Sequence, residues 1–179
     1  VTSRYSLGDT TTLLHSNFVY MRMLACSWLL VTAVLTALVG TSSGKVYRKC
    51  ELASVLERQF RLPRYVIKKW VCIAEFESRF NTAAINPYNY DGSKDYGIFQ
   101  INSMYWCWDG TRGGRNLCGI RCRDLLSDNL SKDVSCALKI LNAQGYSAWV
   151  AYNNKCRYRN LDVYMAECWG ASGRGYNNL

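Results

Sequence analysis

Residues 64–80 read RYVIKKWVCIAEFESRF, and this stretch decides the fold. Its apolar residues recur at three- and four-residue steps, a spacing that predicts an amphipathic helix with a wide buried face. These residues are Val66, Ile67, Trp70, Val71, Ile73 and Ala74. Pro63 stands just before them, where the first turn of a helix tolerates proline. We therefore expect a helix over 64–80 whose apolar face lies in the core.

Glu77 is a charged residue on the apolar face of this predicted helix. It lies four residues after Ile73 and seven after Trp70, spacings that bring side chains to the same face. A carboxylate there is partly desolvated, and desolvation favours the neutral acid. A carboxylic acid that stays protonated near neutral pH can serve as a general acid. Glu75 falls on the other side of the helix, and we expect it to be solvated and inert.

The remaining patterns predict an α+β fold. Further helix patterns cover 50–60 and 131–141, with shorter helical segments around Trp149 and over 163–168. Between the second and third helices, residues 86–93 read NPYNYDGS, and the Asp-Gly pair in this stretch is typical of a β-hairpin. Residues 96–101 are predicted to form a strand. A small antiparallel hairpin beside a group of helices implies a cleft between the two parts.

Asp95 is the second candidate carboxylate. It stands at the start of the predicted strand, after a polar turn that contains Asn89, Asp91 and Ser93. Polar neighbours that donate hydrogen bonds to a carboxylate keep it ionised. A neutral carboxyl group at Glu77 and a charged one at Asp95 would give the division of labour that glycoside hydrolysis uses. By itself, the pattern fits a structural capping role as well.

The start of the chain predicts secretion. An apolar run from Leu24 to Val39 follows Arg22 and precedes the small residues of 41–44, the order typical of a secretory signal peptide. The run is shorter than the roughly 20 residues of a membrane span, and a transmembrane anchor is the alternative. We expect a disordered upstream extension over 1–20, a signal peptide over 21–44 cleaved after Gly44, a secreted catalytic domain over 45–168 and a disordered tail over 169–179.

Cysteines and charge agree with an extracellular domain. Cleavage after Gly44 removes Cys26 from the nine cysteines and leaves eight, an even set that predicts four disulfides. Their spacing alone leaves the pairing open. The net charge of +9 favours a polyanionic partner, although it also fits solubility alone. A secreted protein meets bacterial envelopes, so we expect no nucleic-acid partner.

Several kinds of catalytic site are excluded. The single histidine, His15, precedes the predicted domain, which excludes Ser-His-Asp and Cys-His catalysis within 45–179. Cysteines held in disulfides offer no thiolate nucleophile, and no glycine-rich phosphate-binding motif occurs. Cys118 and Cys122 have the spacing of half a zinc site, but no histidine remains to complete a common ligand set. We expect neither a metal nor a cofactor.

Five segments resemble the c-type lysozymes. They read KVYRKCELA at 45–53, WVCIAEFESRFNT at 70–82, DGSKDYGIFQINS at 91–103, RNLCGIRC at 115–122 and AWVAYNNKC at 148–156. The resemblance covers nearly all of 45–168 and includes all eight cysteines of the predicted domain. It implies a lysozyme-like α+β fold with a helical subdomain, a small antiparallel β subdomain and a cleft between them. The disulfides that it implies are Cys50–Cys168, Cys72–Cys156, Cys107–Cys122 and Cys118–Cys136.

The resemblance also implies a function. It identifies a retaining muramidase that hydrolyses β-1,4 bonds between N-acetylmuramic acid and N-acetylglucosamine, acting on peptidoglycan or a chitooligosaccharide as a monomer. Glu77 matches the proton donor of the family, and Asp95 matches its nucleophile or ion stabiliser. Trp149 would also be the apolar neighbour of Glu77. The positions that match sugar contacts are Gln100, Asn102, Tyr105, Trp106, Ala148 and Trp149.

The chain departs from the family pattern in its aromatic residues and in one loop. Tyr105 stands where many members have a tryptophan, which leaves a smaller stacking platform. Trp108 adds an aromatic residue that we expect to be exposed. The segment between Leu141 and Ala148 is shorter than in vertebrate relatives, so no sugar contact is expected within it. Asn129 begins a glycosylation sequon.

Some members of the family have lost catalysis and bind calcium. In the corresponding loop of this chain, Ser127 and Lys132 occupy two carboxylate ligand positions, while Asp133 remains. Calcium needs several oxygen ligands, and a lysine ammonium group would repel it, so we expect no calcium site. The alternative function is a lysozyme-like protein that binds glycans without catalysis. The presence of both carboxylates argues for the enzyme.

Overall fold

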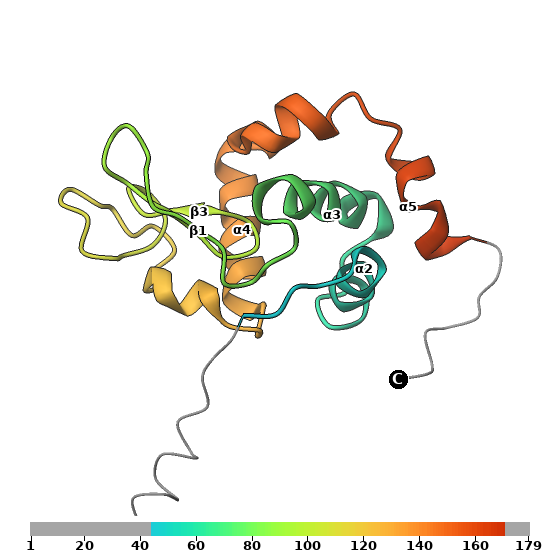
Figure 1. The fold of residues 1–179 in the computed structure, drawn as a ribbon, viewed down its shortest axis with the longest axis horizontal. Coiled ribbons are helices and arrows are strands. Elements are labelled where there is room, and N and C mark those ends of the chain that lie inside the picture. Colours follow the sequence, from blue (N-terminus) through green and yellow to red (C-terminus); the bar gives the residue numbers. More distant parts are fainter. Residues whose placement is uncertain (1–43, 171–179) are drawn as a thin grey trace, which may run out of the picture. The chain divides into compact units, whose positions relative to one another are not determined.

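The computed structural model describes residues 44–170 (Figure 1). Its helices are α2 (Lys49–Arg58), α3 (Arg64–Ser78), α4 (Ser131–Gln144) and α5 (Leu161–Trp169), and its strands are β1 (Ile85–Asn86), β2 (Asp95–Tyr96) and β3 (Ile101–Asn102). Short helical segments follow at η1 (Cys122–Leu126), η2 (Tyr146–Ala148) and η3 (Tyr152–Cys156). No helix within this part of the chain is long and apolar enough to cross a membrane. The predicted extension 1–20 and almost all of the predicted signal peptide lie outside the described residues.

The α+β class is confirmed, and each predicted helix is present. Helix α3 ends at Ser78, two residues earlier than predicted, because Arg79 and Phe80 both adopt left-handed backbone conformations with φ of 52° and 64°. Their amides donate to the carbonyl groups of the last helical turn, which closes the helix. Trp169, which the sequence analysis placed in the tail, is the last residue of α5.

The predicted strand over 96–101 is wrong. The structure has two short strands there, β2 and β3, separated by a turn in which Gly97 and Gln100 have φ of 76° and 48°. A Cβ atom at Gly97 would lie 2.4 Å from the carbonyl oxygen of Leu125, so only glycine fits this close approach. The sheet is therefore three-stranded and antiparallel, in the order β1-β2-β3. The turn at 91–92 lies between β1 and β2, as the hairpin prediction requires.

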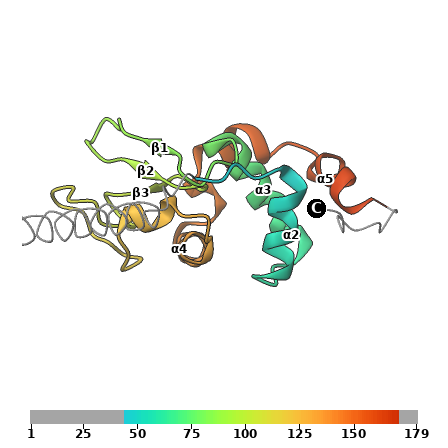
Figure 2. The same ribbon diagram turned by 60° about the horizontal axis from the view of Figure 1, so that its bottom comes forward.

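Helix α3 supplies the centre of the core. Five of its apolar residues are at most 1% exposed: Ile67, Trp70, Val71, Ile73 and Ala74. The ring of Trp70 packs against Phe99 from the β2–β3 turn and against Trp149 after η2, with ring centroids 5.1 and 4.8 Å apart. Figures 1 and 2 both show the sheet on one side of α3, with α2 and α5 toward the other side. The buried face of α3 thus joins the sheet to the helices.

Four disulfides cross-link the domain, as predicted. Cys50–Cys168 joins α2 to α5, and Cys72–Cys156 joins α3 to η3. Cys107–Cys122 and Cys118–Cys136 fasten the long loop after β3 to η1 and to α4. These are the pairs that the resemblance implies. A native disulfide in a small domain typically contributes about 2–5 kcal/mol to stability, so the bridges support a core of modest size.

Asp133 is a buried carboxyl group in the first turn of α4. It is 0% exposed, and its side-chain oxygens face the backbone N–H groups of Asp133 itself and of Ile98 without reaching full hydrogen-bond geometry. A Cβ atom at Gly97 would lie 2.7 Å from its Oδ1, which shows how closely the β2–β3 turn covers it. Burial raises the pKa of Asp133 from 3.8 to about 8. The folded protein therefore holds this carboxyl group in its neutral form at pH 7.

The raised pKa of Asp133 predicts a stability that decreases with pH. Between about pH 4 and 8 the unfolded chain has lost this proton while the folded protein keeps it, so the free energy of unfolding falls as pH rises. The decrease in the free energy of unfolding is complete above about pH 8 and amounts to a few kcal/mol. Asp133→Asn removes the ionisable group and keeps its shape. Urea denaturation from pH 5 to 9 should show a shallower decline for this variant than for the wild type.

The control for this measurement is Asp162→Asn, which changes an exposed carboxylate at the start of α5. It should leave the pH dependence of the wild type in place. A decline in Asp133→Asn as steep as in the wild type would show that Asp133 is not the group responsible.

Candidate active site

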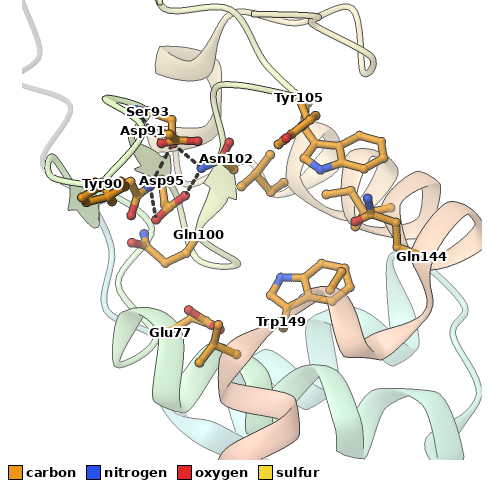
Figure 3. Close-up of a pocket in the computed structure, with 16 residues that line it drawn as sticks. Glu77, Tyr90, Asp91, Ser93, Asp95, Gln100, Asn102, Tyr105, Gln144 and Trp149 are labelled. Atoms are coloured by element: carbon orange, nitrogen blue, oxygen red, sulfur yellow. Dashed lines mark hydrogen bonds between the residues drawn. The ribbon is translucent and has the colours of Figure 1, made fainter.

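A cleft of about 550 Å³ lies between the sheet and the helices. All of the sugar-contact and carboxylate positions identified from the sequence line it: Glu77, Asp95, Gln100, Asn102, Tyr105, Trp106, Ala148 and Trp149. Figure 3 shows Asp95 and Asn102 on the wall formed by the sheet, with Glu77 and Trp149 on the opposite, helical wall. The lining also includes residues that the sequence analysis assigned to no site: Tyr90, Ile140, Gln144 and Val150.

Glu77 lies in the last turn of α3, facing the cleft. Burial raises its pKa above the ordinary value of 4.5, and the negative charge of Asp95 raises it further. The backbone N–H of Ala151 donates a hydrogen bond to its Oε1 at 3.0 Å, which lowers the pKa but does not outweigh burial. The net result is a carboxyl group that holds its proton more tightly than an exposed glutamate does.

Asp95 lies on the central strand of the sheet, between two asparagines. In the antiparallel register it stands opposite Asn86 on β1 and Asn102 on β3. Their Nδ2 groups donate to its carboxylate at 3.1 and 2.8 Å, and Nδ2 of Asn89 adds a third bond at 2.9 Å (Figure 3). Three side-chain amides thus donate hydrogen bonds to the oxygens of this carboxyl group. The polar environment expected from the turn is present, and two of its donors come from strand pairing.

Asn102 has its hydrogen-bonding groups occupied by the protein. Its Nδ2 donates to Asp95 and to Ser93 Oγ, each at 2.8 Å, while its Oδ1 accepts from the backbone N–H of Met104. Ser93 in turn donates to Asp91 at 2.6 Å. Asn102 therefore positions Asp95, a role that the sequence analysis missed. This role follows from the position of Asn102 opposite Asp95, and only the register of the two strands reveals that position.

Trp149 is held firmly in the helical wall. Its indole N–H donates to the carbonyl oxygen of Phe99 at 2.9 Å, and its ring stands edge-on to Trp70. The tryptophan is 5% exposed, so one edge of the ring reaches the cleft. Tyr105 is more open, at 43% exposed, and its ring faces the guanidinium group of Arg115. The cleft thus presents aromatic rings from both walls.

Glu75 and Trp108 lie outside this cleft. Glu75 is partly exposed and forms an ion pair with Arg159 at 3.2 Å, so solvent reaches its side chain. Its position away from the cleft agrees with the prediction that it is inert. Trp108 is 54% exposed, as expected. Its backbone pairs with Ile120 and Cys122, so it belongs to the loop rather than to the cleft lining.

The amino-acid sequence of the chain is similar to those of known proteins. A family model described as the C-type lysozyme/alpha-lactalbumin family matches residues 45–168. Lysozyme C of Penaeus merguiensis is 52% identical over 155 residues, which cover 82% of this chain and 94% of that protein. Lysozyme C of Equus asinus is 46% identical over 127 residues, covering 69% of this chain and 98% of that protein.

Solved structures show the same similarity. A crystal structure of a lysozyme from Litopenaeus vannamei has a TM-score of 0.66 and 55% identity, covering 70% of this chain and 98% of that one. The structure of a calcium-binding lysozyme from equine milk has a TM-score of 0.65 and 44% identity, covering 69% and 98%. At these identities the similarity extends beyond the fold to the sequence.

The electrostatic coupling of the two carboxyl groups can be tested directly. Asp95→Asn removes a negative charge that raises the pKa of Glu77, so that pKa should fall part of the way toward 4.5 while burial still holds it up. The measurement is an NMR titration of ¹³C-labelled glutamate carboxyl groups. Asp91→Asn removes a charge from the same hairpin that does not act on Glu77, and should leave its pKa unchanged. An unaltered Glu77 titration in Asp95→Asn would contradict the coupling.

Proposed function

The chain belongs to the C-type lysozyme/α-lactalbumin family, and we propose that it is a muramidase with Glu77 as general acid and Asp95 as second carboxylate. Lysozyme C relatives at 44–52% identity over most of the chain support the activity. One observation carries the residue assignment: two carboxyl groups share one cleft, one desolvated and the other hydrogen-bonded by three amides. The enzyme hydrolyses β-1,4 bonds between N-acetylmuramic acid and N-acetylglucosamine.

Glu77 begins the reaction by donating its proton to the glycosidic oxygen. The bond from that oxygen to the anomeric carbon then breaks, and the leaving sugar departs as a neutral alcohol. The raised pKa suits this step, because a carboxyl group can donate only while it is protonated. After the step Glu77 is a carboxylate, and it can take a proton from the water that completes hydrolysis.

Asp95 faces the positive charge that develops on the anomeric carbon. As a nucleophile or as a counter-charge, it stabilises that carbon until water attacks from the side that the leaving group vacated. The three amide donors hold its carboxylate in place on the sheet. This division of labour is the established mechanism of lysozymes, the type case of retaining glycosidases, and we extend it to this chain. The product then keeps the β configuration.

The substrate is proposed to be bacterial peptidoglycan, with chitooligosaccharides as soluble analogues. The exposed ring of Tyr105 offers an apolar face to a sugar ring, and the nearly buried Trp106 and Trp149 line the cleft beside it. Gln100 and Ala148 complete the lining. The net charge of +9 favours approach to anionic cell walls. Four disulfides fit an oxidising compartment, which supports secretion. We propose that the secreted domain acts as a monomer.

The loop that binds calcium in some relatives does not fit the ion in this chain. Nζ of Lys132 lies 2.8 Å from Oδ2 of Asp124, so an internal ammonium group already occupies the acidic loop. The hydroxyl of Ser127 donates toward the carbonyl oxygens of Asp124 and Asn129, at 3.4 and 3.2 Å. Asp133 supplies one carboxyl group, but calcium needs several oxygen ligands. We therefore propose a calcium-independent lysozyme.

The mechanism predicts a graded effect of three substitutions on muramidase activity. Glu77→Gln should lower kcat by at least about 100-fold, because an amide cannot donate the required proton. Asp95→Asn should lower kcat by roughly 100- to 1000-fold, because the developing positive charge loses its counter-charge. Glu75→Gln lies outside the cleft and should stay close to the wild type. Turbidity assays on bacterial cell walls measure all three.

The same mechanism predicts the pH dependence and the stereochemistry. Activity should fall as pH rises through the raised pKa of Glu77, because the deprotonated form cannot act as the acid.

NMR of a chitooligosaccharide digest should show the β anomer first. An α product would refute retention, and a fully active Glu77→Gln would refute the acid. Wild-type protein that binds chitooligosaccharides without cleaving them would instead be a non-catalytic member of the family.

Calcium independence has its own measurement. The melting temperature should be the same in millimolar calcium and in chelator, because Lys132 replaces a ligand that the ion would need. A ligand that binds only the folded state raises stability by mass action, so a rise of many degrees with calcium would contradict the reading of the loop. The melting temperature of Lys132→Asp, measured with calcium and with chelator, is the comparison for the wild type, since this variant places a carboxylate at the position of the lysine.

A further inference from the structure

Asn129, Leu130 and Ser131 form a motif that the mechanism above does not use. An asparagine followed two residues later by serine or threonine, with any residue except proline between them, is the acceptor for N-linked sugar in secreted proteins. This is the only such triplet in the 179-residue sequence. It lies between η1 and α4, and Ser131 is the first residue of α4. The chain therefore offers one asparagine of this kind, at the start of a helix.

The two side chains that sugar transfer needs are accessible in the folded protein. Asn129 and Ser131 are both exposed, whereas Leu130 between them is 2% exposed and belongs to the core. Among residues 44–170, neither Nδ2 of Asn129 nor the hydroxyl of Ser131 makes a hydrogen bond. The fold therefore loses no side-chain contact when a sugar is attached to Nδ2.

The structural role of Asn129 uses its oxygen and leaves its nitrogen available. Oδ1 accepts a hydrogen bond at 3.0 Å from the backbone N–H of Ser131, one of the N–H groups at the start of α4 that have no partner within the helix. The carbonyl oxygen of Asn129 accepts from the hydroxyl of Ser127 at 3.2 Å, which holds the backbone on the other side. A sugar on Nδ2 leaves the amide and its Oδ1 in place, so the hydrogen bond from Ser131 is kept.

We propose that Asn129 carries an N-linked oligosaccharide. In the transfer, Nδ2 forms a bond to the anomeric carbon of the first sugar of a lipid-pyrophosphate-linked oligosaccharide, and the bond from that carbon to the pyrophosphate oxygen breaks. Nδ2 loses one proton, and the lipid pyrophosphate leaves, so the step needs no oxidant or reductant. The inference rests on the proposed secretion, because the transferase and its lipid-linked donor act in the lumen of the secretory pathway.

The attached oligosaccharide lies away from the catalytic cleft. The residues of α4 that line the cleft are Ile140 and Gln144, toward the other end of the helix. At 1.5 Å per residue they lie about 14 and 20 Å along the helix axis from Ser131. No residue of η1 or of the segment between η1 and α4 lines the cleft. Enzymatic removal of the oligosaccharide should therefore leave kcat and KM for chitohexaose unchanged, and a changed KM would overturn this placement.

The experiment expresses the full chain in a cultured animal cell line and measures the mass of the secreted protein before and after treatment with peptide N-glycosidase. The wild type should lose mass, and the enzyme should convert Asn129 to aspartate. Peptide mapping after release in ¹⁸O-labelled water locates that conversion in the sequence. A secreted wild type with the mass of the bare polypeptide, or with the label at another residue alone, would overturn the site.

Four variants separate sugar attachment from the structural role of Asn129. Asn129→Asp keeps the Oδ1 that accepts from Ser131 and removes the acceptor nitrogen, so the sugar should be absent. Ser131→Ala removes the hydroxyl of the motif and should also abolish attachment, while Ser131→Thr keeps a hydroxyl and should retain it. Ser135→Ala is the matched control, because Ser135 is exposed on the same helix outside the motif, and it should retain the sugar. Sugar that survives in Asn129→Asp or in Ser131→Ala would overturn the assignment.

Failure of the proposed secretion gives a different result. If the full chain stays inside the cells, the signal of an unrelated secreted protein is added before Val1 and the mass measurement is repeated. Sugar at Asn129 in that protein supports the site although the predicted signal peptide has failed, and its absence rejects the site. The mass measurement does not depend on catalysis, so an inactive wild type would count against the muramidase assignment alone.

Discussion

The burial of Trp70 is the interaction on which the rest of the structure depends. Its indole packs against Phe99, Tyr146 and Trp149, with ring centroids 5.1, 5.5 and 4.8 Å apart. Phe99 belongs to the turn of the sheet, and the other two rings belong to the segment after α4, so one side chain joins both walls of the cleft to α3. Burying such a side chain gains about 4–6 kcal/mol. That gain exceeds the cost of about 1–3 kcal/mol for its indole N–H, which has no hydrogen-bond partner among residues 44–170.

The two walls give their carboxyl groups opposite environments. Glu77 stands at the end of the packed helix α3, where apolar neighbours and the helix C-terminus both disfavour an anion. Asp95 stands on a short polar sheet, where amide groups from both adjacent strands point at its oxygens. The hydrogen bond from Trp149 to Phe99 connects the walls beside the cleft. A carboxyl group with a raised pKa and a carboxyl group hydrogen-bonded by amides can therefore share one cleft, which neither wall could provide by itself.

Much of the fold could be predicted because helices follow local periodicity. The apolar spacing on α3 predicted both its start at Arg64 and the face that is buried. Its end could not be predicted, because Arg79 adopts a left-handed conformation that its residue type does not favour. The strand over 96–101 was predicted wrongly for a related reason. Gly97 turns the chain there, and any larger residue would collide with Leu125 and Asp133, which come from remote parts of the sequence.

In the site, too, some features depend on residues nearby in the sequence and others on contacts between distant segments. The sequence by itself determined that Glu77 lies on an apolar helix face and that Asp95 follows a polar turn, because both facts depend on neighbours within a few residues. The tertiary structure alone decided that Asn102 holds Asp95, through strand register. It also decided that Tyr90 and Gln144 line the cleft. Spacing along the chain specifies which face of an element is buried, whereas the packing of distant segments determines which faces meet across a cleft.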